Sequence, residues 1–489
     1  MTRTRISIDP ITRLEGHGKI DIFLDDAGDV AETYLQIPEL RGFEKFCEGR
    51  PVEELPRIVT RICGVCPEAH HMASAKACDA VYHVDPPPTA KKLRELLYSA
   101  FFTGDHTLHF YALGGPDFVV GPTAPAAERN ILGVIGKVGL EVGQRVIRQR
   151  SGAQEVVKLL GGKAVHPVTS LPGGVAKGLT EQERARVEEL AKDFVDFAAF
   201  TLQLFEDVVL KNREYVDLIT GDVYRQRVYS MGTVDGAGCV NFYDGTVRVV
   251  DPAGQPFLSF APKEYLQHLA EHVEPWTYLK YPFLKKVGWK GFEEGEGSGV
   301  YRATPLARLN AADGMATPKA QAAYLRMFET LGGKPVHLTL ATHWARVIEL
   351  MYAAERTLEL ATDPAITGTE IRTIPTATPD EGVGCVEAPR GTLFHHYWTD
   401  GRGLVKKINL IVGTTNNHAA ISMAIKRAAK HLIHAGKAAD DGLLNMVEMA
   451  FRAFDPCFGC ATHSLPGQLP LELRLRDPRG DVIRVIRRP

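Results

Sequence analysis

Two short cysteine pairs stand at opposite ends of this chain and constrain its fold more than any other feature. The first is Cys63-Gly64-Val65-Cys66 and the second is Cys457-Phe458-Gly459-Cys460. Each C-x-x-C lets two sulfurs converge on one metal within a single turn, and four thiolates are soft ligands that favour zinc, nickel, copper(I) or an iron–sulfur cluster. A site made by all four cysteines would join residues that nearly the whole chain separates.

A structural zinc site is the simplest interpretation of two such pairs. Zinc ribbons, however, place their pairs roughly 15 to 20 residues apart, so that a small fold closes around the ion. A thioredoxin-like redox motif needs a C-x-x-C after a strand in a βαβ setting, and neither pair has that setting. The spacing therefore counts against both interpretations, although a zinc-stabilised scaffold stays open as an alternative.

Composition excludes several other classes. Lys and Arg (57) nearly balance Asp and Glu (59), so the basic excess of a nucleic-acid-binding protein is missing. No run approaches the roughly 20 apolar residues of a membrane helix, and the first residues carry no signal peptide, which predicts a cytoplasmic protein. Eight cysteines spread over 489 residues argue against a disulfide framework. The four outside the pairs are expected to be small buried hydrophobic residues: Cys47, Cys78, Cys239 and Cys385.

The hydrophobic pattern predicts a mainly helical α+β protein, with a central bundle of long helices and peripheral small β-sheets and hairpins. Alternating residues predict an N-terminal hairpin over residues 19–37. Thr89 is expected to cap a helix that reaches about Ala112, and Thr180 with Glu183 forms a capping box before a long helix. Further helices are expected over residues 126–150, 154–160, 319–329, 343–361, 418–434 and 441–454.

The chain is expected to form one compact domain over residues 1–463, because no repeat or flexible linker divides it. Strand-like segments and Gly/Asp turns predict a β-rich insertion at about residues 228–261. Residues 464–489 form a separate C-terminal extension. Its two alternating segments, Leu469 to Arg476 and Val482 to Arg487, predict a hairpin.

The segments around the cysteines are more specific than the pairs alone. They are R-x-C-G-x-C-x-x-x-H over residues 61–70 and D-P-C-x-x-C-x-x-H over residues 455–463. Together they resemble the two signature motifs of nickel–iron hydrogenase large subunits. The resemblance covers nearly the whole chain and is strongest to the cytoplasmic, multi-subunit viologen-reducing and bidirectional types. Three further segments match that family in order: Thr12 to His17, Arg41 to Phe46, and Glu387 to Gly391 followed by His395-His396-Tyr397.

This resemblance implies the catalytic large subunit of a nickel–iron hydrogenase, an oxidoreductase that cleaves and forms dihydrogen. It implies a binuclear centre in which nickel is bound by all four cysteines, with Cys63 and Cys457 terminal and Cys66 and Cys460 bridging to an iron. That iron is expected to carry one carbon monoxide and two cyanide ligands. Such ligands need a dry pocket with a few hydrogen-bond donors.

Residues of the matched segments are expected to form that pocket. By the resemblance, Pro389 would line it, and Arg390 and Thr414 would face the cyanides. Asp117 and Asp455 would hold the Arg390 guanidinium, since outer groups orient the groups that face a metal.

Heterolytic cleavage of dihydrogen requires a metal to take the hydride and a base within about 3 Å to take the proton. By the resemblance, the base is the thiolate of Cys457, and the guanidine of Arg390 is the other candidate. Glu15 would then carry the proton outward. The alternative for Glu15 is a salt-bridged surface glutamate beside Arg13.

Two further sites follow from the resemblance. Glu44 and His463 match positions that bind a magnesium ion near the C-terminus, although histidine is a less typical ligand for magnesium. His70 lies one helical turn beyond Cys66 and is expected either to donate a hydrogen bond to its sulfur or to occupy an ordinary core position. Residues 464–489 would be a maturation extension removed directly after His463.

The implied partners are an iron–sulfur small subunit, further flavin or iron–sulfur subunits, a maturation protease and nickel-insertion proteins. The electron acceptor stays open between a nicotinamide, a deazaflavin, ferredoxin and a bifurcating flavoenzyme. A non-catalytic relative of the quinone-site subunit of respiratory complex I is the alternative from another class. That protein has a similar fold but lacks the cysteine ligands, all four of which are present here.

Overall fold

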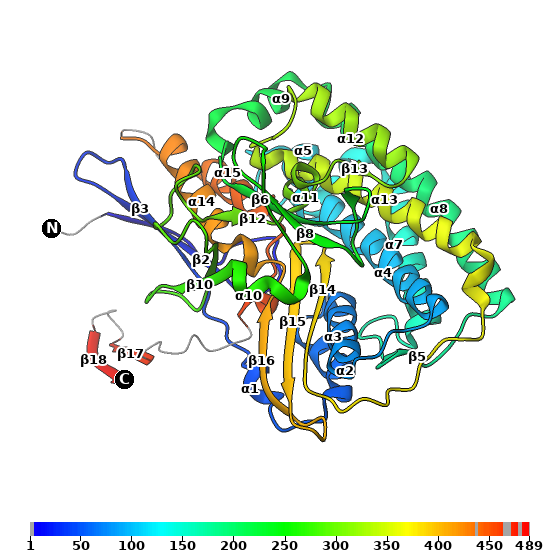
Figure 1. Ribbon diagram of the computed structural model, residues 1–489. Helices are drawn as coiled ribbons and strands as arrows, with labels where there is room; N and C mark the ends of the chain where they lie inside the picture. Colours follow the sequence, from blue (N-terminus) through cyan, green and yellow to red (C-terminus); the bar gives the residue numbers. More distant parts are fainter. Residues whose placement is uncertain (1–3, 436–438, 463–470, 478–481, 489) are drawn as a thin grey trace.

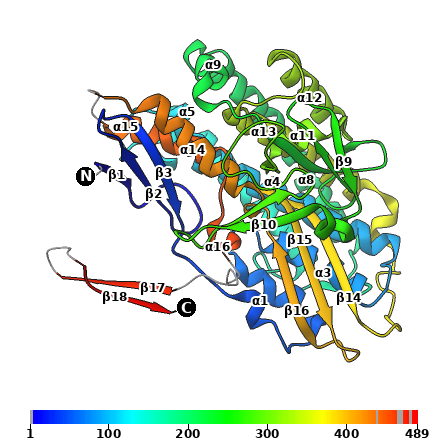
Figure 2. The ribbon, with the colours of Figure 1, turned by 60° about the vertical axis from the view of Figure 1, so that its left-hand side comes forward.

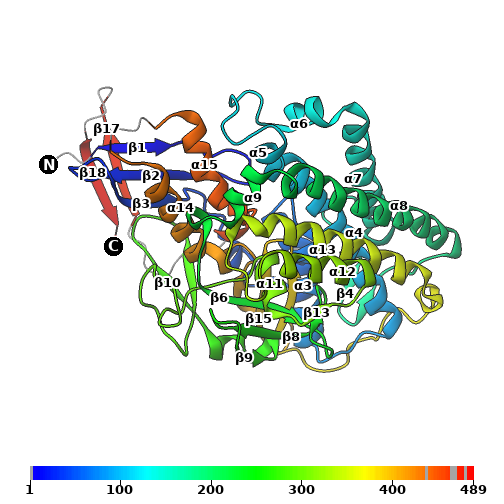
Figure 3. The same cartoon turned by 90° about the horizontal axis from the view of Figure 1, so that it is seen from above.

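Long helices form the body of the molecule. The computed structural model describes residues 4–435, 439–462, 471–477 and 482–488. In this part of the chain long helices pack side by side around a common core, which confirms the predicted mainly helical α+β fold (Figures 1 and 3). They are α4 (Pro88–Leu108), α7 (Leu140–Gly161), α8 (Glu181–Phe205), α12 (Pro318–Thr330) and α13 (Thr342–Thr362).

Helix starts follow local sequence signals. The predicted capping box of α8 is present, because Thr180 Oγ1 accepts from Glu183 N and Glu183 Oε2 accepts from Thr180 N. Helix α4 begins at Pro88, one residue before the predicted cap at Thr89, since a proline in the first helical position leaves no amide unpaired. Beyond Leu108 the chain continues as a π-helix, η3 (His109–Gly114). The end predicted for this helix, near Ala112, lies within η3.

The helices expected over residues 126–150 and 154–160 are divided differently. The break lies at Gly139, whose φ of 94° separates α6 (Ile131–Val138) from α7. The expected break after residue 150 is wrong, because α7 runs on to Gly161. A Cβ atom on Gly152 would lie 3.1 Å from the Phe194 ring, so this glycine allows α8 to approach closely and does not end the helix.

A central helix and a three-stranded sheet connect the two ends of the chain. Helix α3 (Pro67–Val81) lies on the antiparallel sheet of β14 (Glu381–Ala388), β15 (Gly391–Thr399) and β16 (Val405–Ile411) (Figure 1). A Cβ atom on Gly384 would lie 2.0 Å from the Ala73 carbonyl oxygen, so helix and strand touch backbone to backbone. This close packing fixes the start of α3 relative to the turn between β14 and β15.

Small sheets surround the helical body, as predicted. The N-terminal hairpin is present and gains a third strand in the order β1 (Arg5–Ile8), β2 (Lys19–Leu24) and β3 (Val30–Gln36) (Figure 2). Strands are present in the range predicted for the β-rich insertion. They are β6 (Tyr229–Val234), β7 (Cys239–Val240), β8 (Thr246–Val250) and β9 (Pro256–Phe260), joined by the later strands β12 (Tyr301–Arg302) and β13 (Gly314–Met315).

The last helices return the chain to its beginning. They are α14 (His418–Leu432), α15 (Asp441–Arg452) and the short α16 (Phe458–Ala461), and the first two match the predicted ranges closely. The predicted C-terminal hairpin is also present, as β17 (Leu471–Arg476) paired with β18 (Val482–Arg488), and it lies outside the helical body (Figures 1 and 2). Among the described residues no helix is long and apolar enough to cross a membrane.

Candidate metal centre

The two cysteine pairs meet in the core. The Sγ atoms of Cys63, Cys66, Cys457 and Cys460 all lie within 4.8 Å of one another, and all four residues are buried. Cys63 Sγ is 3.3 Å from Cys457 Sγ, and Cys66 Sγ is 3.2 Å from Cys460 Sγ. Four soft sulfur donors at this separation fit a metal such as nickel or iron. The predicted four-cysteine site is therefore present.

Backbone geometry directs the sulfurs toward one point. Cys66 caps the N-terminus of α3, with Pro67 in the first turn, and Cys457 caps α16. The partial positive charge at a helix N-terminus stabilises thiolates. Asp455 has a φ of 54° directly before Pro456, so the chain turns sharply between α15 and Cys457. These two helix starts place the cysteine pairs face to face.

Glu15 contacts the cluster directly. Its Oε2 lies 3.1 Å from Cys457 Sγ and accepts a hydrogen bond from Gly459 N at 2.9 Å. Its backbone oxygen also accepts from Phe458 N, which holds the two segments in register. Burial, followed by the nearby Cys63, raises the pKa of Glu15. The side chain is still 20% exposed, so it extends from the buried sulfur toward the surface.

Arg390 lies close enough to the cluster to interact electrostatically with Cys457 and Cys66. It follows β14 in the turn to β15, is buried, and pairs with Asp105 at 3.2 Å and with Asp455 at 3.1 Å. Burial alone would lower the pKa of Arg390, but the two carboxylates raise it well above its ordinary value. The guanidinium is therefore held in place and in its charged form.

Asp117 does not hold Arg390, so that prediction is wrong. Its carboxylate binds Arg13 at 2.5 Å and Arg452 at 2.6 Å, and Asp105 takes the predicted place beside Arg390. Asp105 lies near the end of α4 and Asp117 lies in the short helix α5 (Pro116–Val119) that follows, so the two are close in sequence. One signal could have identified Asp105: it lies on the apolar face of α4, four residues after the buried Phe101, where a carboxylate needs a partner.

Pro389 and Thr414 have contacts in the core near the cysteine cluster, and their roles beside an iron stay predictions. Both are buried; the Pro389 carbonyl oxygen accepts from Arg346 Nη1 at 3.1 Å, and Thr414 Oγ1 accepts from Cys457 N at 3.1 Å. His70 is fully buried, with Nδ1 3.0 Å from Nε2 of His395, which agrees with a core position.

Glu44 belongs to the short helix α1 (Phe43–Phe46), and its Oε1 accepts from Leu410 N at 2.8 Å. Its predicted magnesium partner, His463, lies outside the described residues. The magnesium pair therefore stays a prediction. The four remaining cysteines agree with the expectation in part, since Cys239 is half-buried and the other three are buried.

Comparison with known proteins decides the family. The model described as nickel-dependent hydrogenase matches residues 41–130 and 265–463, and a HoxL-like model matches residues 5–40. The first of these covers more than half of the chain and contains all four cysteines. The chain belongs to the nickel-dependent hydrogenase family.

Relatives resemble this hydrogenase over its whole length. It is 53% identical over 483 residues to an iron-sulfur subunit of the F420-non-reducing hydrogenase of Archaeoglobus profundus, covering 99% of each chain. It is 38% identical over 493 residues to the beta subunit of the NAD-reducing hydrogenase HoxS of Cupriavidus necator, covering 98% of each. A crystal structure of an NAD+-reducing nickel–iron hydrogenase in the H2-reduced state matches with a TM-score of 0.88 and 39% identity, over 94% of this chain and 100% of that one.

The chain is thus the catalytic large subunit of a nickel–iron hydrogenase, with its active site at the four-cysteine cluster. The zinc-scaffold alternative is not supported, because the cluster coincides with the family's signature motifs. The complex I alternative fails as well, since the cysteines that such a relative lacks are present and converge.

Proposed function

We propose that Cys457 and Glu15 handle, in that order, the proton released when dihydrogen is cleaved at the four-cysteine site. When bound, the nickel–iron centre supplies the Lewis-acid and redox chemistry that polarises dihydrogen and accepts its electrons. The 3.1 Å contact between Cys457 Sγ and Glu15 Oε2 carries the proposal, because a proton moves only between groups within hydrogen-bond reach. The partial exposure of Glu15 supports an outward route from there.

Arg390 has a different role in this proposal. Because Asp105 and Asp455 keep its guanidinium charged, it serves as a hydrogen-bond donor over the centre and Cys457 serves as the base. We further propose that all four cysteines would hold nickel and that Cys66 and Cys460 would also hold the iron. The convergence of all four sulfurs within 4.8 Å supports one shared site for both metals.

The buried surroundings support an iron that carries carbon monoxide and two cyanides, with Pro389, Arg390 and Thr414 at its pocket. Metal analysis and infrared spectroscopy of the purified enzyme test the centre. We expect nickel and iron together with bands from bound carbon monoxide and cyanide. Zinc alone, with no such bands, would refute it.

We propose that the direct electron acceptor is an iron–sulfur small subunit, with further flavin or iron–sulfur subunits beyond it. Relatives are named as parts of larger hydrogenases, one of them as NAD-reducing and one as an iron-sulfur subunit. Among the described residues, no second group of three or more His, Cys, Asp or Glu side chains is placed to hold a metal. A relay cluster must therefore come from a partner docked over a large interface. A cytoplasmic location stays a prediction.

The isolated chain should be inert as an electron-transfer enzyme. Purified alone with its metals in place, it should reduce a viologen dye with hydrogen at a small fraction of the rate of the co-purified complex, because its buried centre lacks a relay. Metal content and infrared bands should match those of the complex. Dye reduction at the full rate by the single chain would contradict the proposal.

We propose that Glu44 and His463 bind magnesium and that the chain is cut after His463 during maturation by a dedicated protease, once nickel-insertion proteins have loaded the site. Thr462 is buried and accepts a hydrogen bond from Arg41 N through its backbone oxygen, whereas the β17–β18 hairpin lies outside the helical body. A cut after His463 would remove the hairpin and leave the buried segment that ends at Thr462 in place. If the chain is not cut after His463, the hairpin is an ordinary surface β-ribbon.

Intact mass spectrometry tests the cleavage. Residues 464–489 carry six arginines against Glu472, Asp477 and Asp481, a net charge of +3. Removing them should change the formal net charge from -2 to -5 and leave a chain that ends at His463. Fully active enzyme whose chain still ends at Pro489 would refute the proposal.

A further inference from the structure

Arg308 is a fully buried cation at the junction of several elements. It lies on α11 (Pro305–Ala311), and its side chain has no exposed surface. Its Nε and Nη2 donate to the two carboxylate oxygens of Glu349 on α13, at 2.7 and 2.6 Å. Burial alone would raise the pKa of Glu349, but Arg308 and His106 lower it to about 2. This bidentate pair fixes the orientation of the guanidinium plane.

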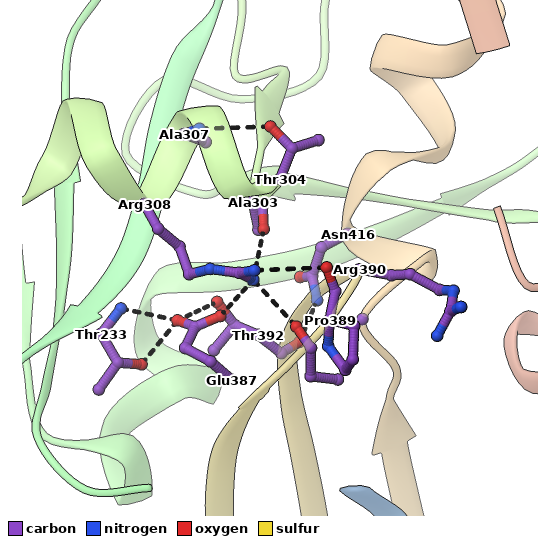
Figure 4. Close-up of polar contacts among 12 residues, drawn as sticks. Thr233, Ala303, Thr304, Ala307, Arg308, Glu387, Pro389, Arg390, Thr392 and Asn416 are labelled. Atoms are coloured by element: carbon purple, nitrogen blue, oxygen red, sulfur yellow. Dashed lines mark hydrogen bonds and ion pairs between the residues drawn. The ribbon is translucent and has the colours of Figure 1, made fainter. Parts of the chain in front are cut away.

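The opposite edge of the guanidinium holds the end of β14. Nη1 donates to Glu387 Oε2 at 3.1 Å and to the Ala388 carbonyl oxygen at 2.9 Å, and Nη2 donates to the Pro389 carbonyl oxygen at 3.3 Å. One side chain thus binds three consecutive residues. The next residue is Arg390, and Figure 4 shows its side chain leaving this network in the direction away from Arg308.

Glu387 is itself held from the other side. Its Oε1 accepts from Thr233 N at 2.7 Å, from Thr233 Oγ1 at 2.8 Å and from Thr392 Oγ1 at 3.0 Å (Figure 4). Thr233 belongs to β6 of the β-rich insertion, and Thr392 belongs to β15. The network therefore ties the turn that carries Arg390 to the insertion, to α11 and to α13.

We propose that Arg308 is a positioning residue, which holds the backbone of Ala388 and Pro389 and so sets the direction in which Arg390 projects toward the cysteine cluster. The inference rests on the proposed role of Arg390 beside the metal centre. The Pro389 carbonyl oxygen also accepts from Arg346, which pairs with Asp455 at 3.3 Å. Without Arg308, this second arginine would draw Pro389 toward Asp455 unopposed. A lysine cannot replace Arg308, because its single ammonium group cannot span two carboxylates and three backbone carbonyls, those of Ala303, Ala388 and Pro389.

The test uses the Arg308→Lys variant in the complete, metal-loaded complex. We expect wild-type nickel and iron content, shifted infrared cyanide bands, and a hydrogen-uptake kcat lowered by at least about tenfold, since a displacement of about 1 Å near a reaction centre costs up to about 100-fold. The matched control is Arg302→Lys. Arg302 is equally buried and donates to the Val336 carbonyl oxygen, so this variant loses a buried guanidinium and should keep wild-type cyanide bands.

A second variant decides the matter if Arg308→Lys does not yield metal-loaded enzyme. Glu387→Gln keeps the shape of the side chain but turns an amide N–H group either toward the Arg308 guanidinium or toward the Thr233 backbone N–H, and both of these groups can only donate. It should shift the cyanide bands in the same way with a smaller loss of rate. Wild-type bands and turnover in a loaded variant would overturn the inference. Absence of bands and turnover in the wild type would instead overturn the proposed function.

Discussion

Replacing Cys460 or Cys63 with serine should remove nickel from the chain and abolish hydrogen uptake. Each sulfur is one of four donors within 4.8 Å in a buried site, and a hydroxyl is a poor ligand for the soft metals that thiolates bind. Changes that only disturb the surroundings of a metal ligand already cost about 10- to 100-fold in metal affinity or activity. Loss of a ligand should therefore exceed 100-fold, measured as bound nickel and as hydrogen-dependent dye reduction.

Cys78→Ser provides the matched control. Cys78 is as deeply buried as the cluster cysteines, and its Sγ donates to the Val52 carbonyl oxygen at 3.2 Å, a bond that a serine hydroxyl can also make. The control chain should keep its nickel and its turnover. Full nickel content and hydrogen uptake in Cys63→Ser or Cys460→Ser would contradict the assignment of all four cysteines as ligands.

The metal site was predictable because its ligands lie in two short motifs. Each pair specifies its own turn, and Cys66 and Cys457 then cap helices whose direction the following residues set. The sequence also predicted most helices, since apolar periodicity and capping residues act over a few positions. The helix break wrongly predicted near residue 150 shows where such local signals fail. Gly152 is a helix breaker by propensity, yet its packing against Phe194 on α8 overrides that propensity.

The residues that support the site were not predictable in the same way. Arg390 and Asp105 are 285 positions apart, and Arg308 is 41 positions from Glu349. No local pattern joins such pairs, because the fold alone brings them together. Arg308 stands within the apolar run Leu306 to Leu309, where a long cation would be expected to reach the surface. It is instead wholly buried, with carboxylates on two sides.

The contacts of Asp117 help to hold the segment that carries Glu15. Asp117 joins Arg13 to Arg452, the last residue of α15, and Thr12 Oγ1 donates to Glu448 on the same helix at 2.8 Å. The segment that carries Glu15 is thus fastened to the helix that leads into the second cysteine pair. This attachment explains why a loop residue far from the cluster in sequence holds a fixed distance from Cys457.

Glu15→Gln should lower dihydrogen turnover by about 100- to 10,000-fold, the usual contribution of a positioned proton-transfer group, while nickel, iron and the infrared bands persist. Glutamine keeps the size of the side chain and an oxygen that can accept from Gly459 N, but it cannot take a proton from Cys457. Exchange of hydrogen isotopes between dihydrogen and solvent should fall with turnover, because both need the proton to leave the site. Electron transfer to the partner plays no part in that exchange.

Glu39→Gln is the matched control for this variant. Glu39 is 20% exposed, as Glu15 is, and also lies near Arg41, at 4.0 Å compared with 3.6 Å for Glu15. The two acids thus share exposure and a cationic neighbour, and the contact with Cys457 is the feature that the test isolates. Glu39→Gln should keep wild-type turnover and isotope exchange. If Glu15→Gln keeps them as well, Glu15 is an ion-pair partner of Arg41, and the proton must leave Cys457 by another route.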